Sequence, residues 1–437
     1  MRIIHTSDWH LGQHFYGKSR APEHQQFLNW LIEQSQSQQI DAIIVAGDIF
    51  DTGTPPSYAR EMYFDFIAKL HQANCQLVVL AGNHDSVAML SESQNLLQQL
   101  STRVISAVSD NMAEQVFVLN SLKTEQQAVI CAIPFIRPRD IVKSYAGQSA
   151  SEKQRSLQQA ITGHYQTLFS QAQTLSVENQ AEDTRLSIIA TGHLTTIGAS
   201  LSESVRDIYI GTLEAFPASE FPAADYIALG HIHRPQKVTK SEHIRYSGSP
   251  IALSFDEAKT EKSIVIAEFK NGELSDVELC PVPCFQALAM VKTQLETLTD
   301  NIMAVVEANH SERKENIWLD IEIESAEYLQ DLSVRIEQII AELPVEVLLV
   351  RRSKKSRLEM PSHEKKITLS ELSVQDVFDA RMELESWQSD EQQQRRTRLN
   401  SLYLDIAEQT QLASSAAHSP ELNSTIDNSS DTKTEQK

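Results

Sequence analysis

Cysteine is scarce in this chain, which has only four among 437 residues. Four cysteines cannot build a disulfide framework for a chain of this length, so we expect a reducing compartment. Cys280 and Cys284 are separated by three residues, and no second Cys or His pair lies nearby, which disfavours a structural zinc site. Packing roles, also for Cys75 and Cys131, are the simpler interpretation.

Long apolar runs are missing as well. No stretch reaches the roughly 20 apolar residues that a membrane span needs. The chain starts with a strand-like run from Arg2 and has no charged-then-apolar signal sequence. We therefore expect a globular cytoplasmic protein with no membrane partner.

Positive charge is in deficit, since the formal net charge is −21. A generally basic surface, which nucleic-acid binding normally requires, is thereby excluded. Any contact with DNA must then be local. The candidates are Lys18, Arg20, Arg137, Arg139, Arg234 and the segment 351–366.

Apolar residues make up 41% of the chain, which is enough to bury large cores in two or three domains. From residue 2 to about 267, apolar runs that read as strands alternate with helical stretches such as 23–38 and 58–73. This alternation predicts a layered α/β domain over residues 1–280. Within it, apolar residues at helical spacing in 141–183 predict an amphipathic surface helix.

The composition changes after about residue 285. A helix at 287–298, a strand at 317–323, a helix at 328–342 and a strand at 345–350 are expected. Together they predict a small α+β capping domain over 281–350, which would shape a substrate cleft.

The C-terminal part divides into three expected segments. Residues 351–369 form a basic linker, and 370–411 are helical with regularly spaced apolar residues. Because so short a helical region cannot bury its apolar face alone, we expect it to dock on a partner. Residues 412–437 are rich in Ser, Asn and Thr, and we expect disorder there.

Five apolar runs end in side chains that can bind metals. Since the carboxyl ends of parallel strands meet at one edge of a sheet, these side chains are expected to converge. Oxygen and imidazole donors without a thiolate suit Mn²⁺ or Fe better than Mg²⁺ or Zn²⁺. The donors are Asp8, His10, Asp48, Asn83, His193, His231 and His233.

The same blocks resemble those of the calcineurin-like metallophosphoesterase family. They are Asp-x-His at 8–10, Gly-Asp-x-x-Asp at 47–51, Gly-Asn-His-Asp at 82–85, Gly-His at 192–193 and Gly-His-x-His at 230–233. The resemblance implies an α/β fold with a layered β-sandwich flanked by helices, a small α+β capping domain and a C-terminal helical region.

The resemblance also implies roles for the individual residues. It implies two Mn²⁺ ions, with Mg²⁺ or Fe as alternatives. Asp8, His10 and His233 would hold one metal, and Asn83, His193 and His231 the other. Asp48 would bridge the two, and His84 would donate a proton to the leaving oxygen.

More narrowly, the blocks resemble those of DNA nuclease subunits within this family. That resemblance implies a double-strand exonuclease and hairpin or single-strand endonuclease acting in DNA repair, replication and recombination. It also implies docking of 370–411 on an SMC-type coiled-coil ATPase, and a homodimer within a heterotetramer.

Asp51 has two interpretations. An acid in a Thr-Gly-Thr-Pro-Pro loop is commonly an exposed turn residue. The interpretation that we favour is catalytic: the Asp51 carboxylate accepts a hydrogen bond from the His84 ring and so orients it.

Other functions remain open at this point. A small-molecule or cyclic-nucleotide phosphodiesterase has the same metal blocks, although the capping domain and the docking segment favour DNA. Residues 12–19 fit a phosphate-loop pattern, but the strand does not lead directly into Gly12 and Pro22 follows where a helix should start, which makes a P-loop NTPase the remote alternative. A non-catalytic scaffold is disfavoured because every ligand position is filled. A protein phosphatase is disfavoured because Thr52 stands where that class has Arg.

Overall fold

The computed structural model describes residues 1–142, 149–180, 184–197, 199–200, 202, 215–309, 316–324 and 332–352, with scattered positions between 378 and 403. The chain divides into two compact units, Met1–Glu359 and Met360–Lys437. Almost all of the expected linker, docking region and tail at 351–369, 370–411 and 412–437 therefore lies outside the described residues.

The first sheet has six strands in the order β14-β13-β1-β4-β5-β6. Strands β1, β4, β5 and β6 run parallel, while β13 pairs antiparallel with β1 and with β14. The hairpin expected after residue 263 is present, with Asn271 and Gly272 at positive φ in its turn. The strands are β1 Arg2–Thr6, β4 Ala42–Ala46, β5 Gln76–Leu80, β6 Thr102–Ile105, β13 Ser263–Lys270 and β14 Glu273–Pro281.

The second sheet also has six strands, in the order β11-β12-β10-β9-β8-β7. The inner strands β8, β9, β10 and β12 are parallel, and β7 and β11 pair antiparallel at the two edges. The strands are β7 Val116–Asn120, β8 Gln127–Cys131, β9 Ser187–His193, β10 Tyr226–Gly230, β11 Gln236–Lys237 and β12 Ile244–Tyr246.

The two sheets pack face to face. Ile44 and Val78 of the first sheet share one buried core with Ile130 and Ile189 of the second. On the other face of the first sheet, Ile43 packs in a separate core with residues of helices α1 Ala21–Ser37 and α2 Ser57–Gln72. Strand β4 is thus buried on both faces, which explains its unbroken apolar run.

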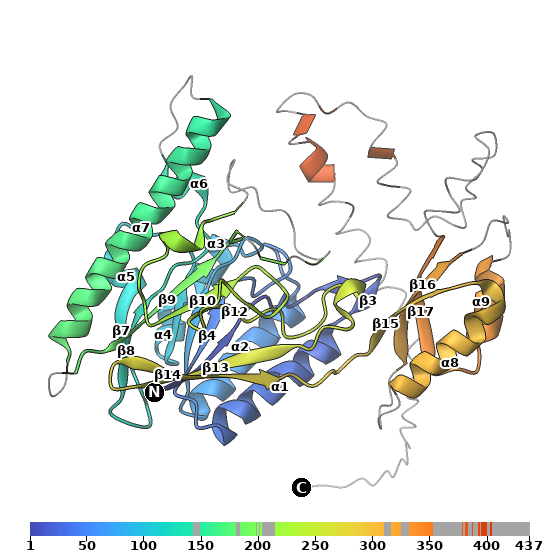
Figure 1. Cartoon of the computed structure of the whole chain (residues 1–437), viewed down its shortest axis with the longest axis horizontal. Helices are drawn as coiled ribbons and strands as arrows, with labels where there is room; N and C mark the ends of the chain where they lie inside the picture. Colours follow the sequence, from blue (N-terminus) through green and yellow to red (C-terminus); the bar gives the residue numbers. More distant parts are fainter. Residues whose placement is uncertain are drawn as a thin grey trace, which may run out of the picture. The chain divides into compact units, whose positions relative to one another are not determined.

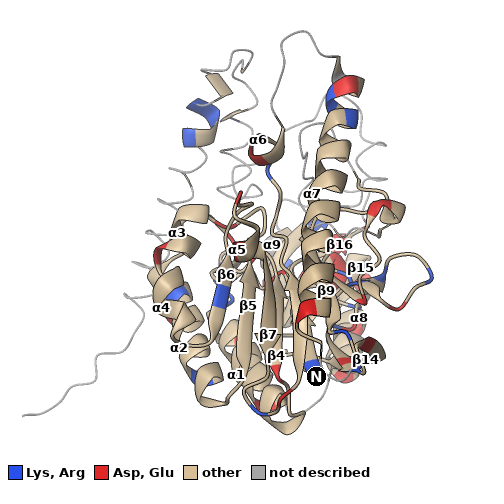
Figure 2. Ribbon diagram, turned by 90° about the vertical axis from the view of Figure 1, so that its left-hand side faces the viewer, with Lys and Arg blue, Asp and Glu red and all other residues tan. Residues whose placement is uncertain are grey.

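Helix α7 Ala150–Glu178 covers the outer face of the second sheet, so helices flank both sides of the sandwich (Figure 2). Leu157, Ile161 and Tyr165 are buried in the core that it forms with that sheet. Ser149 and Glu152 begin the helix with a reciprocal capping box. The expected amphipathic helix in the insertion is confirmed, as is the layered α/β arrangement.

Short elements connect these layers. They are β2 His14–Phe15, β3 Lys18–Ser19, α3 Val87–Glu92, α4 Gln94–Gln98, α5 Met112–Gln115, α6 Pro138–Ile141, and the 3₁₀ turns η1 Ala218–Glu220, η2 Phe255–Glu257 and η3 Leu295–Thr297. In the described part of the chain, no helix is long and apolar enough to cross a bilayer.

A third sheet follows, in orange in Figure 1, with three parallel strands in the order β15-β16-β17. Strands β16 Ile317–Ile323 and β17 Val345–Arg352 match the expected strands, and helix α9 Leu332–Ile340 lies within the expected second helix. The expected helix at 287–298 is wrong. Residues Leu288–Thr293 form strand β15, and the helix, α8 Leu298–Ala308, starts only where the expected one ends.

The reason for this error is local. Leu288, Ala289, Met290 and Lys292 all have good helix propensity, and this misleads a reading of the segment by itself. In the fold, β15 pairs with β16 and turns Val291 and Thr293 inward, with exposed Lys292 between them. Sheet pairing and burial outweigh the propensity.

Candidate metal centre

The predicted donors gather at one edge of the sandwich. Asp8 and His10 follow β1, Asp48 follows β4, Asn83 and His84 follow β5, His193 ends β9, and His231 and His233 follow β10. In the first sheet, β1, β4 and β5 are neighbours, and in the second, β9 and β10 are. Both sheets therefore deliver their donors at the carboxyl ends of parallel strands, as open α/β folds do for their ligands.

One donor group consists of Asp8, His10 and His233, whose ligand atoms all lie within 4.8 Å of one another. All three side chains are buried. The Asp8 carboxylate also accepts a hydrogen bond from the backbone N–H of His231, at 2.9 Å. This contact joins the loop after β1 to the loop after β10.

The second donor group consists of Asp48, His193 and His231, again within 4.8 Å. His193 Nε2 lies 3.2 Å from Asp48 Oδ2 and 2.9 Å from Asn83 Oδ1. Its Nδ1 donates to the Ala46 carbonyl at 2.8 Å, because a carbonyl can only accept. The tautomer of His193 is thereby fixed, with Nε2 directed at the other donors.

The Asp48 carboxylate links the two groups. Its Oδ2 lies 3.7 Å from Nε2 of His10, a member of the first group, and 3.2 Å from Nε2 of His193 in the second. Its Oδ1 accepts the backbone N–H of His84 at 2.9 Å. Asp48 thus stands in the position that a bridging ligand requires.

The residues fit divalent cations on two further observations. The Nε2 atoms of His10 and His231 are buried and have no hydrogen-bond partner among the described residues, so a metal would satisfy both. Burial opposes the charge of Asp48, yet His193, His84 and His10 hold its pKa well below the usual range. Burial likewise opposes the charge of His10, but Asp51, Asp48 and Asp8 raise its pKa to about 9. The carboxylates thus make this pocket favourable for positive charge.

The backbone at the site is strained. Asp8, His10, Asp48 and His231 have φ values of 54°, 47°, 51° and 96°, in a region that side chains other than glycine rarely occupy. Such strain costs about 1–3 kcal/mol per residue and clusters at functional sites. The sequence carries no signal for it.

Two glycines permit the close packing of the donor loops. A Cβ on Gly82 would lie 2.1 Å from Asp48 Oδ1. A Cβ on Gly47, whose φ is +97°, would lie 2.1 Å from His193 Nδ1. The glycines before the donors therefore make room for side chains from neighbouring strands.

The prediction for Asp51 is wrong in its partner. His84 Nδ1 lies 2.7 Å from the backbone oxygen of Asp51. The Asp51 carboxylate instead lies 3.2 Å from His10 Nδ1. The sequence places Asp51 and His84 at neighbouring strand ends, but only the loop conformation decides which atoms of Asp51 face which histidine.

Asp85 is a site residue to which sequence reasoning gave no role. Its carboxylate accepts the backbone N–H groups of Ile49, Phe50 and Gly82, at 3.1, 3.0 and 2.8 Å. Burial and the charge of Asp48 raise its pKa to about 6. Asp85 thus ties the loop after β4 to the loop after β5. The signal was the second acid of the Gly-Asn-His-Asp block.

The phosphate-loop alternative fails in the fold. Residues 12–19 contain the strand pair β2–β3, and helix α1 starts only at Ala21, so there is no loop that wraps a phosphate at a helix N-terminus. Of the basic candidates, Arg20 is buried against Glu23 and Lys18 pairs with Glu346. Arg137 contacts the centre, donating to the Asp85 carbonyl at 3.2 Å.

Comparisons with known proteins agree with this geometry. Residues 1–235 match the family described as calcineurin-like phosphoesterase, and residues 284–386 match a domain described as the type 5 capsule protein repressor C-terminal domain. The chain belongs to the calcineurin-like phosphoesterase family, and the resemblance seen in the sequence is confirmed.

Its curated relatives within the family share one name, the SbcD subunit of the nuclease SbcCD. The chain is 52% identical over 396 residues to this protein from Escherichia coli strain K12, covering 91% of this chain and 96% of the relative. It is 32% identical over 335 residues to the protein of the same name from Bacillus subtilis strain 168, covering 75% and 80%. The predicted place among the SbcD nuclease subunits is confirmed.

Proposed function

We propose that this chain is the nuclease subunit of an SbcCD-type complex and hydrolyses DNA phosphodiesters at the centre around Asp48. The observation that carries the proposal is the convergence of both donor groups on that one buried carboxylate. The relatives, which match nearly the whole chain, supply the substrate class. Action in the cytoplasm, in DNA repair, replication and recombination, belongs to the same proposal.

In this proposal, Asp8, His10 and His233 hold one metal, and Asn83, His193 and His231 hold the other, with Asp48 between them. The donor chemistry favours two Mn²⁺ ions, with Mg²⁺ or Fe as alternatives. When bound, two such ions supply charge neutralisation for the phosphoryl group and a water of lowered pKa.

His84 is proposed to protonate the leaving oxygen. Its Nδ1 donates to the Asp51 carbonyl, so the ring is held in one orientation and proton exchange falls to Nε2. A His84 nitrogen lies within 4.8 Å of ligand atoms of His10 and Asp48, which puts the ring beside the reacting group. Proton transfer from a placed histidine supplies about 10²–10⁴-fold in rate.

The substrate range separates this proposal from its runner-up, a small-molecule or cyclic-nucleotide phosphodiesterase. We expect the purified chain with Mn²⁺ to degrade linear duplex DNA from its ends and to open DNA hairpins, alone or with its ATPase partner. Asp48→Ala should abolish both activities together with Mn²⁺ binding. Hydrolysis of a chromogenic diester or a cyclic nucleotide, with no DNA cleavage even in the presence of the partner, would favour the runner-up.

The partner is proposed to be an SMC-type coiled-coil ATPase that binds residues 370–411, within a heterotetramer built on a homodimer of this chain. The shared name of the relatives, which describes one component of the nuclease SbcCD, supports a complex. A chain that ends at residue 369 should fail to co-purify with the ATPase and should keep hydrolysis of a chromogenic diester. Undiminished co-purification would refute this docking site.

A further inference from the structure

A buried ion pair lies beneath His233, and the proposed mechanism does not use it. Glu257, the last residue of η2, has no exposed surface, and Lys262 has 8%. Lys262 Nζ lies 2.6 Å from Glu257 Oε2. Burying two charges in this way is costly unless both are well paired, and a neutral pair of similar size would often serve stability equally well. Stability alone therefore gives little reason for the pair.

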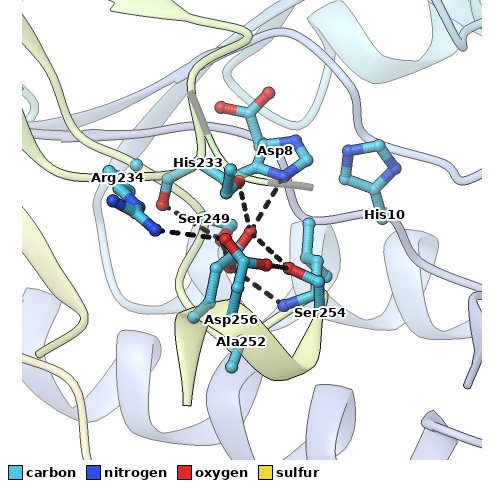
Figure 3. A network of polar contacts seen from close by, with 12 residues as sticks. Asp8, His10, His233, Arg234, Ser249, Ala252, Ser254 and Asp256 are labelled. Atoms are coloured by element: carbon cyan, nitrogen blue, oxygen red, sulfur yellow. Dashed lines mark hydrogen bonds and ion pairs between the residues drawn. The ribbon is translucent and has the colours of Figure 1, made fainter. Parts of the chain in front are cut away.

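Glu257 contacts a proposed metal ligand directly. Its Oε1 lies 3.4 Å from His233 Nδ1. Figure 3 shows the His233 ring with Asp8 on one side and, on the other, the polar network that contains Ser249, Ser254 and Asp256. With Nδ1 facing the network, His233 would bind a metal through Nε2.

The Glu257 carboxylate is itself held from several directions. The backbone N–H of Leu253 donates to Oε2 at 3.0 Å. The hydroxyls of Ser202 and Ser254 donate to Oε1 at 2.6 and 3.2 Å. A carboxylate fixed by so many donors cannot turn away from His233 without leaving buried groups unpaired.

Lys262 holds the other end of the same histidine. Its ammonium group donates to the His233 carbonyl at 3.0 Å and to Ser249 Oγ at 2.8 Å. Lys262 thus fixes the backbone of His233, and through Glu257 it also fixes the carboxylate that faces the ring.

The other histidines of the centre follow a common rule. The Nδ1 of His193 faces the Ala46 carbonyl, and that of His84 faces the Asp51 carbonyl. His10 Nδ1 faces the Asp51 carboxylate. His233 follows the same rule with Glu257 as its partner. Outer oxygens of this kind fix the tautomer of a ligand histidine and raise its basicity.

We propose that Glu257 is a positioning residue that orients His233 for the metal shared with Asp8 and His10, and that Lys262 locks it in place. The inference rests on the two-metal centre proposed above. Because His10 and His233 are both backed by carboxylates whereas His193 is backed by a carbonyl, the effect of Glu257 should be confined to one of the two metal positions.

The direct test is Mn²⁺ binding to full-length Glu257→Gln, followed by calorimetry and by electron paramagnetic resonance. The amide keeps the shape and loses the negative charge. We expect affinity at one position to fall by about 10–100-fold, the usual effect of losing such an outer partner, while the other position stays as in the wild type. The resonance signal of a coupled metal pair should then require higher Mn²⁺ concentrations.

A second variant separates positioning from simple charge balance, because Glu257→Gln also leaves the Lys262 ammonium buried without its partner. The double variant Glu257→Gln/Lys262→Met removes both charges and should recover most of the thermal stability lost in the single variant. If Glu257 positions His233, the double variant still binds Mn²⁺ weakly at one position. Wild-type affinity at both positions in the double variant would overturn the inference.

Glu23→Gln is a matched control. Glu23 is another buried carboxylate in an ion pair, with Arg20 Nε at 2.6 Å, and it contacts none of the proposed metal ligands. Its Mn²⁺ affinities should equal those of the wild type. If the wild-type chain itself binds no Mn²⁺ pair, the proposed metal centre fails, and this outcome differs from a failure of the role of Glu257 alone.

Discussion

His84 Nδ1 donates to the backbone oxygen of Asp51 at 2.7 Å, and this contact does not depend on the side chain at position 51. The Asp51 carboxylate lies 3.2 Å from Nδ1 of a different histidine, His10. A single residue thus orients the proposed general acid through its backbone and a proposed metal ligand through its side chain. The two contacts can be tested separately.

Asp51→Asn should weaken metal binding and leave proton donation intact. The His84 contact persists in this variant, whereas His10 loses a charged acceptor. We expect Mn²⁺ affinity to fall by about tenfold or more, and turnover to recover at saturating Mn²⁺. Turnover measured against Mn²⁺ concentration checks this. Unchanged Mn²⁺ affinity with turnover lost at saturation would show that the carboxylate serves His84 after all.

His84→Ala should produce the opposite pattern. Both metals should bind with wild-type affinity, since His84 is not among the proposed ligands. Turnover at saturating Mn²⁺ should fall by about 10²–10⁴-fold, which is the contribution of a general acid. Calorimetry and turnover on one preparation suffice. Loss of a bound metal would instead make His84 a ligand.

Gly82→Ala should disrupt the centre sterically. The new Cβ would lie 2.1 Å from Asp48 Oδ1, closer than any real contact allows. We expect loss of Mn²⁺ binding and of hydrolysis, with a lowered melting temperature. Gly163→Ala is the control: it lies in α7 with nothing within 4 Å of the added Cβ, and Ala should stabilise the helix by about 0.5–1 kcal/mol. Full activity in Gly82→Ala would contradict the packing described for the donor loops.

Asp85→Asn should loosen the two central loops. The carboxylate accepts three backbone N–H groups, and an amide nitrogen would turn a donor toward them. Unfolding free energy should fall by about 1–3 kcal/mol, measured by chemical denaturation. Asp110→Asn, at an exposed position, should change it by less than about 0.5 kcal/mol. Equal stability of the two variants would show that Asp85 does not tie the loops.

The sequence alone determined much of this site because its information is local. An apolar run followed at once by Asp48 or His193 marks both a buried strand and the residue that the strand presents at its end. The order of these blocks was enough to indicate the family. Strand β15 was misread because its local signal, good helix propensity, was overruled by a partner distant in sequence.

Only the tertiary structure decided how the donors are supported. The contact of Asp51 with His10, the grip of Asp85 on two loops and the pair Glu257–Lys262 beneath His233 all join residues that no spacing rule connects. The strained backbone at Asp8 and Asp48 is likewise imposed by the packed sandwich around it. A strand pattern fixes which side chain reaches the edge of a sheet. Which atoms then meet depends on loop conformations, and these are set by hydrogen bonds and packing across the whole fold.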